Sequence, residues 1–158
     1  MQLLYNIYYK FNKEKVETSK KYLKLIKIDK VYDLIIKNCW KYSVQYEIVF
    51  KNQEVLEIML YGRKKSTFLK FHITPIVFYE DYTHFLWKAH NMNCNKAYYI
   101  NTGIFEKNIL TNYNKDYWSR YVSLEDANKF IEKQIMMHPK HKPYLNIKYI
   151  DFCRYIPE

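Results

Sequence analysis

Carboxylates on neighbouring predicted strands are the first residues of this chain that could support a reaction. Glu47 and Glu57 fall in two apolar segments of strand character, and Asp151 falls in a third. Two carboxylates on adjacent strands can hold Mg²⁺ for phosphodiester cleavage. Many metal-dependent nucleases place an acid two residues before a lysine, and none of the 16 acidic residues here has that neighbour. A small metal-dependent nuclease is therefore kept as an alternative only.

Histidine and cysteine do not form a familiar metal-binding pattern. A structural zinc ion needs four ligands, usually as two closely spaced pairs. His90 and Cys94 are four residues apart, and His138 and His141 flank Pro139, but neither pair has a matching second pair. We therefore expect no metal ion and no cofactor.

Nucleophilic and phosphoesterase motifs are also missing. His72 and Thr74 form one His-x-Thr pair, but two-histidine phosphoesterases need this pair twice, and the other four histidines lack the threonine. Gly62 and Gly103 are the only glycines, so a glycine-rich phosphate loop cannot be built. These observations predict a protein that is not an enzyme.

Lysine dominates the charge. Lys and Arg number 26 against 16 acidic residues, which gives a net charge of +10. A basic surface favours an anionic partner such as nucleic acid. An A/T-rich genome would also raise the lysine content, and arginine, the better ligand for phosphate, occurs only three times. Both explanations of the charge remain open.

Two groups of residues are the candidate binding sites. The first combines lysines at helical spacing with a basic turn and comprises Lys20, Lys24, Lys27, Lys30, Arg63, Lys64 and Lys65. The second is aromatic and comprises Tyr98, Tyr113, Tyr117, Trp118 and Tyr121. Lysines can neutralise phosphates, whereas exposed aromatic rings can stack on bases or anchor a protein partner. With 18 tyrosines in the chain, some must be exposed, because each buried hydroxyl needs a hydrogen-bond partner.

Hydrophobic periodicity predicts the elements that position these residues. In chain order they are a strand over 3–11, a helix over 18–40, three strands of an antiparallel meander within 44–79, a helix over 81–91, strands over 97–100 and 117–122, a helix opened by a capping box at Ser123, and a strand over 144–155. The order β-α-β-β-β-α-β-β-α-β predicts a single α+β domain over residues 1–158, with helices packed on one largely antiparallel sheet.

The compartment follows from the cysteines and the apolar segments. Three cysteines without close spacing suggest reduced thiols, and neither a secretory leader nor an apolar segment of membrane-spanning length is recognisable. We expect a cytoplasmic protein without membrane contact.

The leading functional hypothesis is a non-catalytic binding protein that occupies a surface of a nucleic-acid-handling protein complex. Small size, A/T-rich codon usage and missing catalytic motifs are typical of viral or mobile-element accessory proteins such as inhibitors and immunity proteins. The first alternative is direct binding of single-stranded nucleic acid through Lys and Tyr, and the second is the nuclease. The expected partner is thus a protein, a nucleoprotein complex or nucleic acid itself.

Overall fold

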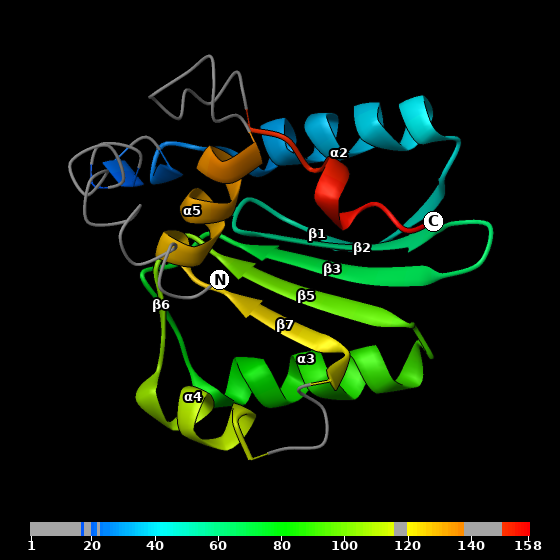
Figure 1. Cartoon of the computed structure of the whole chain (residues 1–158). Helices are drawn as coiled ribbons and strands as arrows, with labels where there is room; N and C mark the ends of the chain where they lie inside the picture. Colours follow the sequence, from blue (N-terminus) through cyan, green and yellow to red (C-terminus); the bar gives the residue numbers. More distant parts are fainter. Residues whose placement is uncertain (1–16, 18–19, 22, 116–119, 138–149) are drawn as a thin grey trace.

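A five-stranded sheet forms the centre of the protein, with helices on both faces (Figure 1). The structure is a computed structural model that describes residues 17, 20–21, 23–115, 120–137 and 150–158. The described elements are α2 (Ile28–Tyr42), β1 (Gln45–Lys51), β2 (Val55–Tyr61), β3 (Ser66–His72), β4 (Ile76–Val77), α3 (Tyr79–Asn91), β5 (Lys96–Asn101), β6 (Ile104–Phe105), α4 (Lys107–Tyr113), β7 (Val122–Glu125), α5 (Ala127–Met137) and a 3₁₀ turn, η3 (Cys153–Tyr155).

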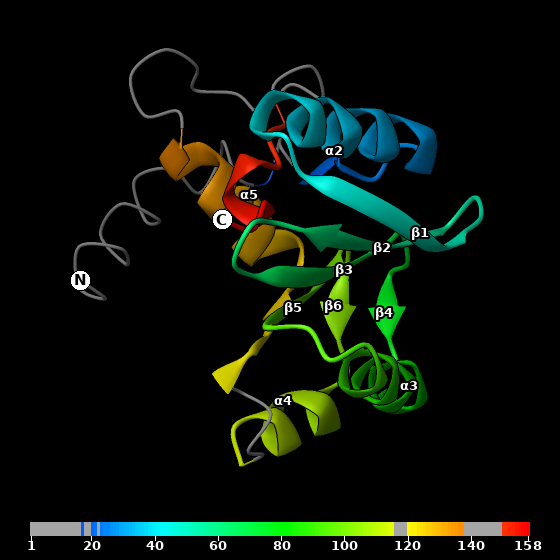
Figure 2. The same cartoon turned by 90° about the vertical axis from the view of Figure 1, so that its right-hand side faces the viewer.

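The strand order of the main sheet is β1-β2-β3-β5-β7. Strands β1, β2 and β3 form the expected antiparallel meander, whereas β5 pairs parallel to β3 and β7 pairs parallel to β5. Strand β3 ends before Pro75, which cannot donate a ladder hydrogen bond. Figure 2 shows the short parallel pair β4 and β6 between this sheet and helices α3 and α4. The α+β class is confirmed.

The two faces of the sheet carry two separate hydrophobic cores. Helices α2 and α5 and the turn η3 cover one face, where Phe71, Phe130 and Phe152 pack together. Helices α3 and α4 cover the other, where Phe68 stacks on Phe85 with ring centroids 5.5 Å apart. Alternate residues of β3 serve alternate faces, as the twofold side-chain period of a strand requires. In the described part of the chain, no helix is long and apolar enough to cross a membrane.

The prediction of one continuous helix over residues 18–40 is wrong, because the helix is interrupted in the middle of this segment. The chain turns at Lys24, Lys27 is extended (φ −106°, ψ 146°), and α2 begins at Ile28. Ile26 and Ile28 are both buried. In a continuous helix, residues two positions apart, such as these, lie about 200° apart around the axis. Only a break in the helix therefore brings both side chains into one core. Lys20 and Lys24 therefore do not share a helix with Lys30.

Two elements in the second half of the chain also differ from those predicted. Ser123 does not open a helix, because Val122–Glu125 is strand β7 and α5 starts at Ala127. Asp126 is the capping residue, since its Oδ1 accepts a hydrogen bond from the Lys129 main-chain N–H at 2.9 Å. Of the strand expected over 144–155, the described residues form coil and η3. The strand expected over 3–11 lies outside the described residues.

Candidate functional site

Two cavities share the segment Ile156–Glu158 as a common wall. The larger, of about 500 Å³, lies between this segment, the end of α2 and the turn between β2 and β3. The smaller, of about 330 Å³, lies between the same segment and the starts of β3 and β5. We refer to the two cavities together as the basic groove, because its cationic lining residues are Lys41, Arg63, Lys65, Lys96 and Arg154.

Main-chain hydrogen bonds seat the shared segment against the β2–β3 turn. The N–H groups of Lys64 and Lys65 donate to the main-chain oxygen of Glu158 at 3.0 and 3.2 Å. A Cβ atom on Gly62 would lie 2.3 Å from that same oxygen, far inside van der Waals contact. Glycine at this position is therefore required for the close approach that shapes both cavities.

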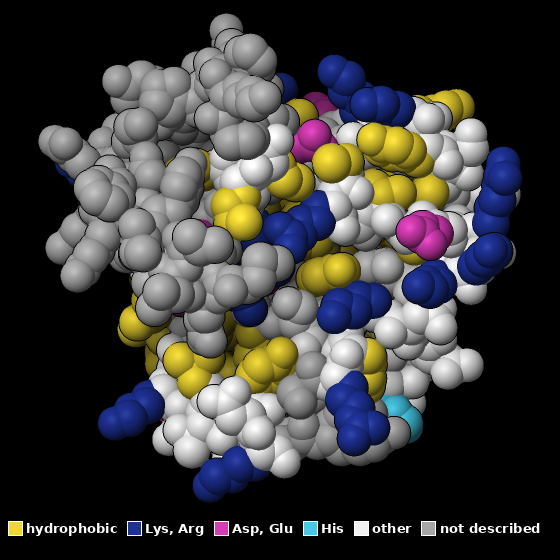
Figure 3. Space-filling model, viewed as in Figure 1, with side chains coloured by type: hydrophobic (Ala, Val, Ile, Leu, Met, Phe, Trp, Pro, Cys, Tyr) yellow, Lys and Arg dark blue, Asp and Glu magenta, His cyan; other side chains and the backbone are white. Residues whose placement is uncertain are grey.

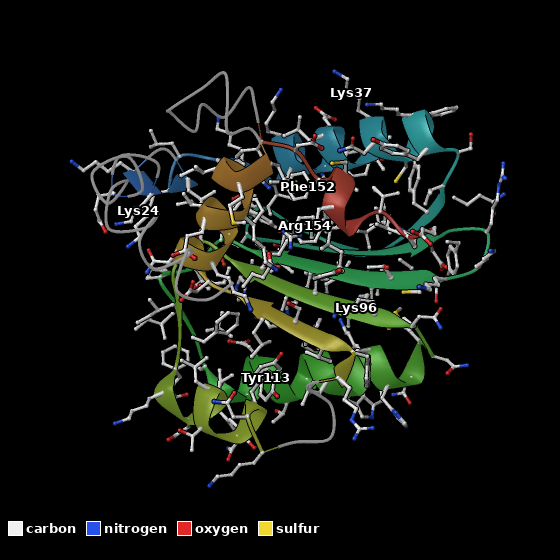
Figure 4. The ribbon with its side chains drawn as sticks, viewed as in Figure 1. Lys24, Lys37, Lys96, Tyr113, Phe152 and Arg154 are labelled. Carbon is white, nitrogen blue, oxygen red and sulfur yellow. The ribbon has the colours of Figure 1, made fainter. Side chains whose placement is uncertain are left out.

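The five cations converge from different parts of the fold. Lys41 comes from the last turn of α2, Arg63 and Lys65 from the β2–β3 turn, Lys96 from β5 and Arg154 from η3. None of the five forms an ion pair with an acid of the described residues, and Glu158 is the one acid that lines either cavity. Figure 3 shows dark blue side chains on this face of the molecule, where Figure 4 labels Lys96 and Arg154.

Each cavity also contains a lysine over a tyrosine ring. Lys41 Nζ lies 5.3 Å from the ring centroid of Tyr42, and Lys96 Nζ lies 5.5 Å from that of Tyr98. The half-buried Tyr98 packs edge-on against Tyr155, with ring centroids 4.9 Å apart. Burial raises the pKa of Tyr98, the nearby carboxylate of Glu125 raises it further, and Arg154 opposes the change. The Tyr98 hydroxyl therefore stays protonated at neutral pH.

A buried cluster beneath η3 holds the groove in place. Glu125 on β7 is fully buried and accepts hydrogen bonds from Lys133 Nζ and from Tyr155 Oη, the latter at 2.5 Å. Burial lowers the pKa of Lys133, and the Glu125 carboxylate opposes that effect. The cluster ties α5 and η3 to the sheet, and it thereby positions the main chain at Arg154, the residue before Tyr155.

The structure brings some of the candidate residues together. Lys65 and Tyr98 line the same cavity, and Arg63 lines the adjoining one. Lys64 anchors the shared segment through its main chain.

Other candidate residues lie elsewhere. Lys20 and Lys24 line a different cavity. Lys27, just before α2, and Lys30, within it, are exposed and line neither part of the groove. Tyr113, at the end of α4 (Figure 4), packs in the core between the sheet and helices α3 and α4, where its hydroxyl donates to the Val122 carbonyl at 2.8 Å. Tyr121 packs in that same core. Tyr117 and Trp118 lie outside the described residues.

The candidate binding residues do not include three of the groove cations: Lys41, Lys96 and Arg154. Lys41 belongs to the row of lysines at helical spacing on the helix predicted over 18–40, Arg154 falls in a predicted strand, and Lys96 has no sequence neighbour that marks it. The scarcity of arginine was the available signal, because two of the three arginines, Arg63 and Arg154, line the groove.

The carboxylates considered for a nuclease centre have other partners. Glu57 is 2% exposed, with Oε1 3.2 Å from Lys70 Nζ and Oε2 2.5 Å from Lys88 Nζ. Glu47 accepts a hydrogen bond from the Tyr61 hydroxyl at 3.1 Å. Both oxygens of Glu57 are thus occupied by ammonium groups, which compete directly with a metal ion. The described residues contain no group of three or more His, Cys, Asp or Glu side chains placed to hold a metal.

No family model matches the sequence, and no curated protein is significantly similar to it. Among solved structures, the chain is similar to the MspJI restriction endonuclease in complex with a 27-mer oligonucleotide, at 12% identity and a TM-score of 0.31. The match covers 90% of this chain and 32% of that one. A likeness this distant carries no argument about function.

Proposed function

We propose that this protein binds single-stranded nucleic acid without cleaving it, and that the basic groove is the contact surface. The observation that carries the proposal is the convergence of five cations, none ion-paired within the described residues, on two cavities that each contain a tyrosine. The charge of the whole chain, +10, favours the same class of partner.

The groove supplies the two interactions that single-strand binding requires. Its lysines and arginines can neutralise successive phosphates and release their counterions. The rings of Tyr42 and Tyr98 can stack on bases, which a single strand exposes and a duplex keeps paired. In the free protein, lysine ammonium groups lie over both rings. We expect these ammonium groups to move onto phosphates when bases reach the rings.

A protein partner is the second candidate, because large apolar side chains are exposed on the opposite side of the sheet. Trp87 and Phe78 on and beside α3 are 64% and 58% exposed, and Phe50 on the edge strand β1 is 45% exposed. Lys88 Nζ lies 5.7 Å from the Phe50 ring centroid, so α3 and β1 meet at this surface. Exposed aromatic residues commonly anchor protein interfaces. An accessory protein of a virus or mobile element that engages a nucleic-acid-handling complex would use both surfaces.

A cytoplasmic location is part of the proposal. It is supported by the three cysteines, Cys39, Cys94 and Cys153, all of which are unpaired. Reduced thiols are typical of cytosolic proteins.

Fluorescence anisotropy tests the leading proposal. A labelled single strand of about 12 nucleotides, long enough to cross such a groove, is titrated in parallel with its duplex. We expect tighter binding of the single strand, and a log-linear loss of affinity as salt rises from about 50 to 200 mM. Capture of a protein partner by the exposed aromatic residues would show far weaker salt dependence.

Matched charge reversals locate the site. Lys96→Glu with Arg154→Glu should weaken single-strand binding by at least about tenfold, since two phosphate contacts become repulsive. Lys37→Glu with Lys107→Glu makes the same change in net charge at two exposed residues outside the groove. If both double variants lose affinity equally, the groove has no special role and the proposal fails.

A further inference from the structure

Strand β1 is an open edge of the main sheet. It stands at the end of the strand order, and no strand of the described residues pairs with its outer side. Six of its seven residues are exposed, whereas all four residues of β7, at the opposite edge, are buried. An unpaired edge strand presents main-chain N–H and carbonyl groups to a strand of another chain. The fold thus leaves one of its two edges available for pairing.

Apolar side chains of β1 lie along this edge on the face of the sheet that α2 covers. Tyr46 and Ile48 are 37% and 44% exposed. They lie opposite Leu60 and Ile58 of β2, which belong to the core beneath α2. Residues directly opposite each other on antiparallel strands project to the same face, so both exposed side chains are on the α2 face.

Helix α2 extends this apolar surface. Three of its residues are spaced by four and form one stripe along the helix, in which Tyr32 and Ile36 are half-buried and Trp40 is 77% exposed. Lys51 Nζ of β1 lies 5.5 Å from the ring centroid of Tyr32, so the stripe is on the side of α2 toward the open edge. Figure 2 shows α2 lying along β1. We refer to Tyr32, Ile36, Trp40, Tyr46 and Ile48 together as the edge surface.

The charged residues of β1 do not block this edge. Lysines on an edge strand commonly prevent association through it. Lys51, however, is turned back onto α2 of its own chain, where its Nζ forms an ion pair with Asp29 Oδ1 at 2.5 Å. Glu47 accepts its hydrogen bond from Tyr61 of the neighbouring strand. The pairing of β1 with β2 becomes irregular only beyond Ile48, so the first half of β1 is a regular strand.

Two charges on α2 are arranged to pair with a second copy of the chain. Asp33 and Lys37 are exposed, lie one turn apart beside the apolar stripe, and form no ion pair with a described residue. The contact between Asp29 and Lys51 joins the start of α2 to the end of β1, so helix and strand run in opposite directions. A twofold axis that makes two β1 strands antiparallel therefore makes the two α2 helices antiparallel as well. Each Asp33 then faces the second copy's Lys37.

The dimensions of the fold agree with this arrangement. Because α2 packs on both β1 and β2, its axis lies about one strand spacing, roughly 4.8 Å, from a twofold axis at the outer side of β1. Two α2 helices would be about 10 Å apart, which is the distance between helices in direct contact. Ile48 precedes Lys51 by about 10 Å of strand, equal to about six or seven helical residues beyond Asp29. An axis near Ile48 therefore passes close to Ile36.

We propose that the edge surface joins two copies of this chain into a twofold-symmetric dimer in which the two five-stranded sheets become one continuous sheet. Strand β1 pairs antiparallel with its copy about an axis near Ile48, which keeps the two Glu47 carboxylates from facing each other directly. The stripes of the two α2 helices pack together, and two Asp33–Lys37 ion pairs flank them. The partner is a second copy because this charge pattern complements itself about a twofold axis. The basic groove uses other residues, so the inference does not depend on it.

Sedimentation velocity on the full chain tests the proposal. Between about 1 and 100 μM protein, we expect the measured mass to rise from 19.6 kDa toward twice that value. A mass that stays at 19.6 kDa over the whole concentration range overturns the proposal.

Charge variants identify the surface that dimerises. Lys37→Asp should weaken dimerisation by about tenfold or more, because two repulsive contacts with Asp33 replace two attractive ones. Lys37→Asp with Asp33→Lys should restore the dissociation constant to within about threefold of wild type, since opposite charges face each other again. Lys107→Asp makes the same change at an exposed lysine of α4, on the other face of the sheet, and should dimerise like the wild type. Failure of the double variant to restore the dimer, or an equal loss in Lys107→Asp, contradicts the assignment.

Hydrogen exchange locates the strand pairing. Main-chain amides of residues 45–51 should exchange more slowly at about 100 μM than at about 1 μM protein, because they gain hydrogen bonds across the dimer. Ile48→Lys should abolish both the dimer and this protection, since it places two ammonium groups at the twofold axis. Concentration-dependent protection confined to residues 79–91, with 45–51 unchanged, would place the contact on α3 and overturn the proposal.

Discussion

Lys96 and Arg154 line one cavity although they come from β5 and from η3, in distant parts of the chain. Lys96 lies over the ring of Tyr98, and the main chain at Arg154 is positioned by its neighbour Tyr155, which donates a hydrogen bond to the buried Glu125. Only the folded chain brings these two charges together. Both charges are available to a ligand, since neither is ion-paired within the described residues.

Tyr98 should contribute to binding through its ring. Tyr98→Leu keeps most of the packing against Tyr155 but removes the aromatic face, and it should weaken single-strand binding by about 1–3 kcal/mol, the usual value of one stacked base. Tyr98→Phe keeps the ring and should bind within about twofold of wild type. Anisotropy titrations at one salt concentration measure both variants. Equal binding by the leucine and phenylalanine variants would exclude stacking on this residue.

The exposed lysines beside and on α2 should matter little. Lys27→Glu with Lys30→Glu should change the free energy of unfolding by less than about 0.5 kcal/mol, because exposed sites tolerate substitution. The same double variant should retain single-strand affinity within about threefold, since neither lysine lines the groove. Urea denaturation and anisotropy check the two statements. A loss as large as that of Lys96→Glu with Arg154→Glu would move the interface to α2.

The fold class and most of the elements could be predicted because they depend on local periodicity. The meander and the inward face of α3 follow directly from alternating and helical apolar spacing, and Tyr82, Phe85 and Ala89, at helical spacing, are all buried. The break before α2 could not be predicted, because Ile26 and Ile28 are both core residues and their burial is decided by tertiary packing. The sequence predicts a helix start at Ser123 instead of strand β7, because the polar residues Ser123 and Glu125 are buried by contacts that the sequence does not show.

The candidate site was predicted only in part, for a related reason. The basic turn 63–65 identifies Lys65 as a candidate binding residue, and the adjacent tyrosines at 98 and 99 identify Tyr98. The structure places Lys65 and Tyr98 in one cavity. Arg154 reaches that cavity because η3 replaces the end of a predicted strand. Assignments that require long-range contacts, such as Tyr155 with Glu125, cannot be made from local patterns.

Removing the Glu57 carboxylate should destabilise the fold strongly. Glu57→Ala leaves Lys70, which is 5% exposed, without its partner, and such broken buried pairs cost about 3–5 kcal/mol. Glu47→Ala, on the neighbouring strand but exposed, should cost less than about 0.5 kcal/mol. Urea denaturation gives both values.

The same two variants test the nuclease alternative. Wild-type protein is incubated with single-stranded and double-stranded DNA and RNA, with and without Mn²⁺. We expect no cleavage under any of these conditions. Cleavage by the wild type that is lost in both folded variants would replace the binding proposal with a metal-dependent nuclease.

His72 should make the fold sensitive to mild acid. Burial lowers the pKa of His72 and Lys70 lowers it further, whereas Asp81, Glu54 and Glu57 oppose the shift; the Tyr99 hydroxyl is hydrogen-bonded to its Nδ1 at 2.8 Å. Below the ordinary pKa of 6.5, the unfolded chain therefore binds a proton that the folded chain does not. Stability should fall as the pH falls through about 6.5 and level off, for this group, below the folded pKa.

Urea midpoints measured between about pH 7.5 and pH 5.5 show this effect. His72→Gln should reduce the drop in midpoint over that interval. His84→Gln, on the exposed side of α3, is the matched control and should leave the drop unchanged. An identical pH profile for wild type and His72→Gln would show that His72 does not titrate differently on folding.

Photo-crosslinking tests the location of the interface most directly. A single strand carrying 5-iodouracil at several positions is bound, irradiated and digested, and the modified residues are identified by mass spectrometry. The basic groove predicts crosslinks at Tyr98 or Tyr42, and it predicts their loss in Lys96→Glu with Arg154→Glu. Crosslinks confined to Trp87 and Phe50 on the opposite side of the sheet, with the groove tyrosines unmodified, would contradict it.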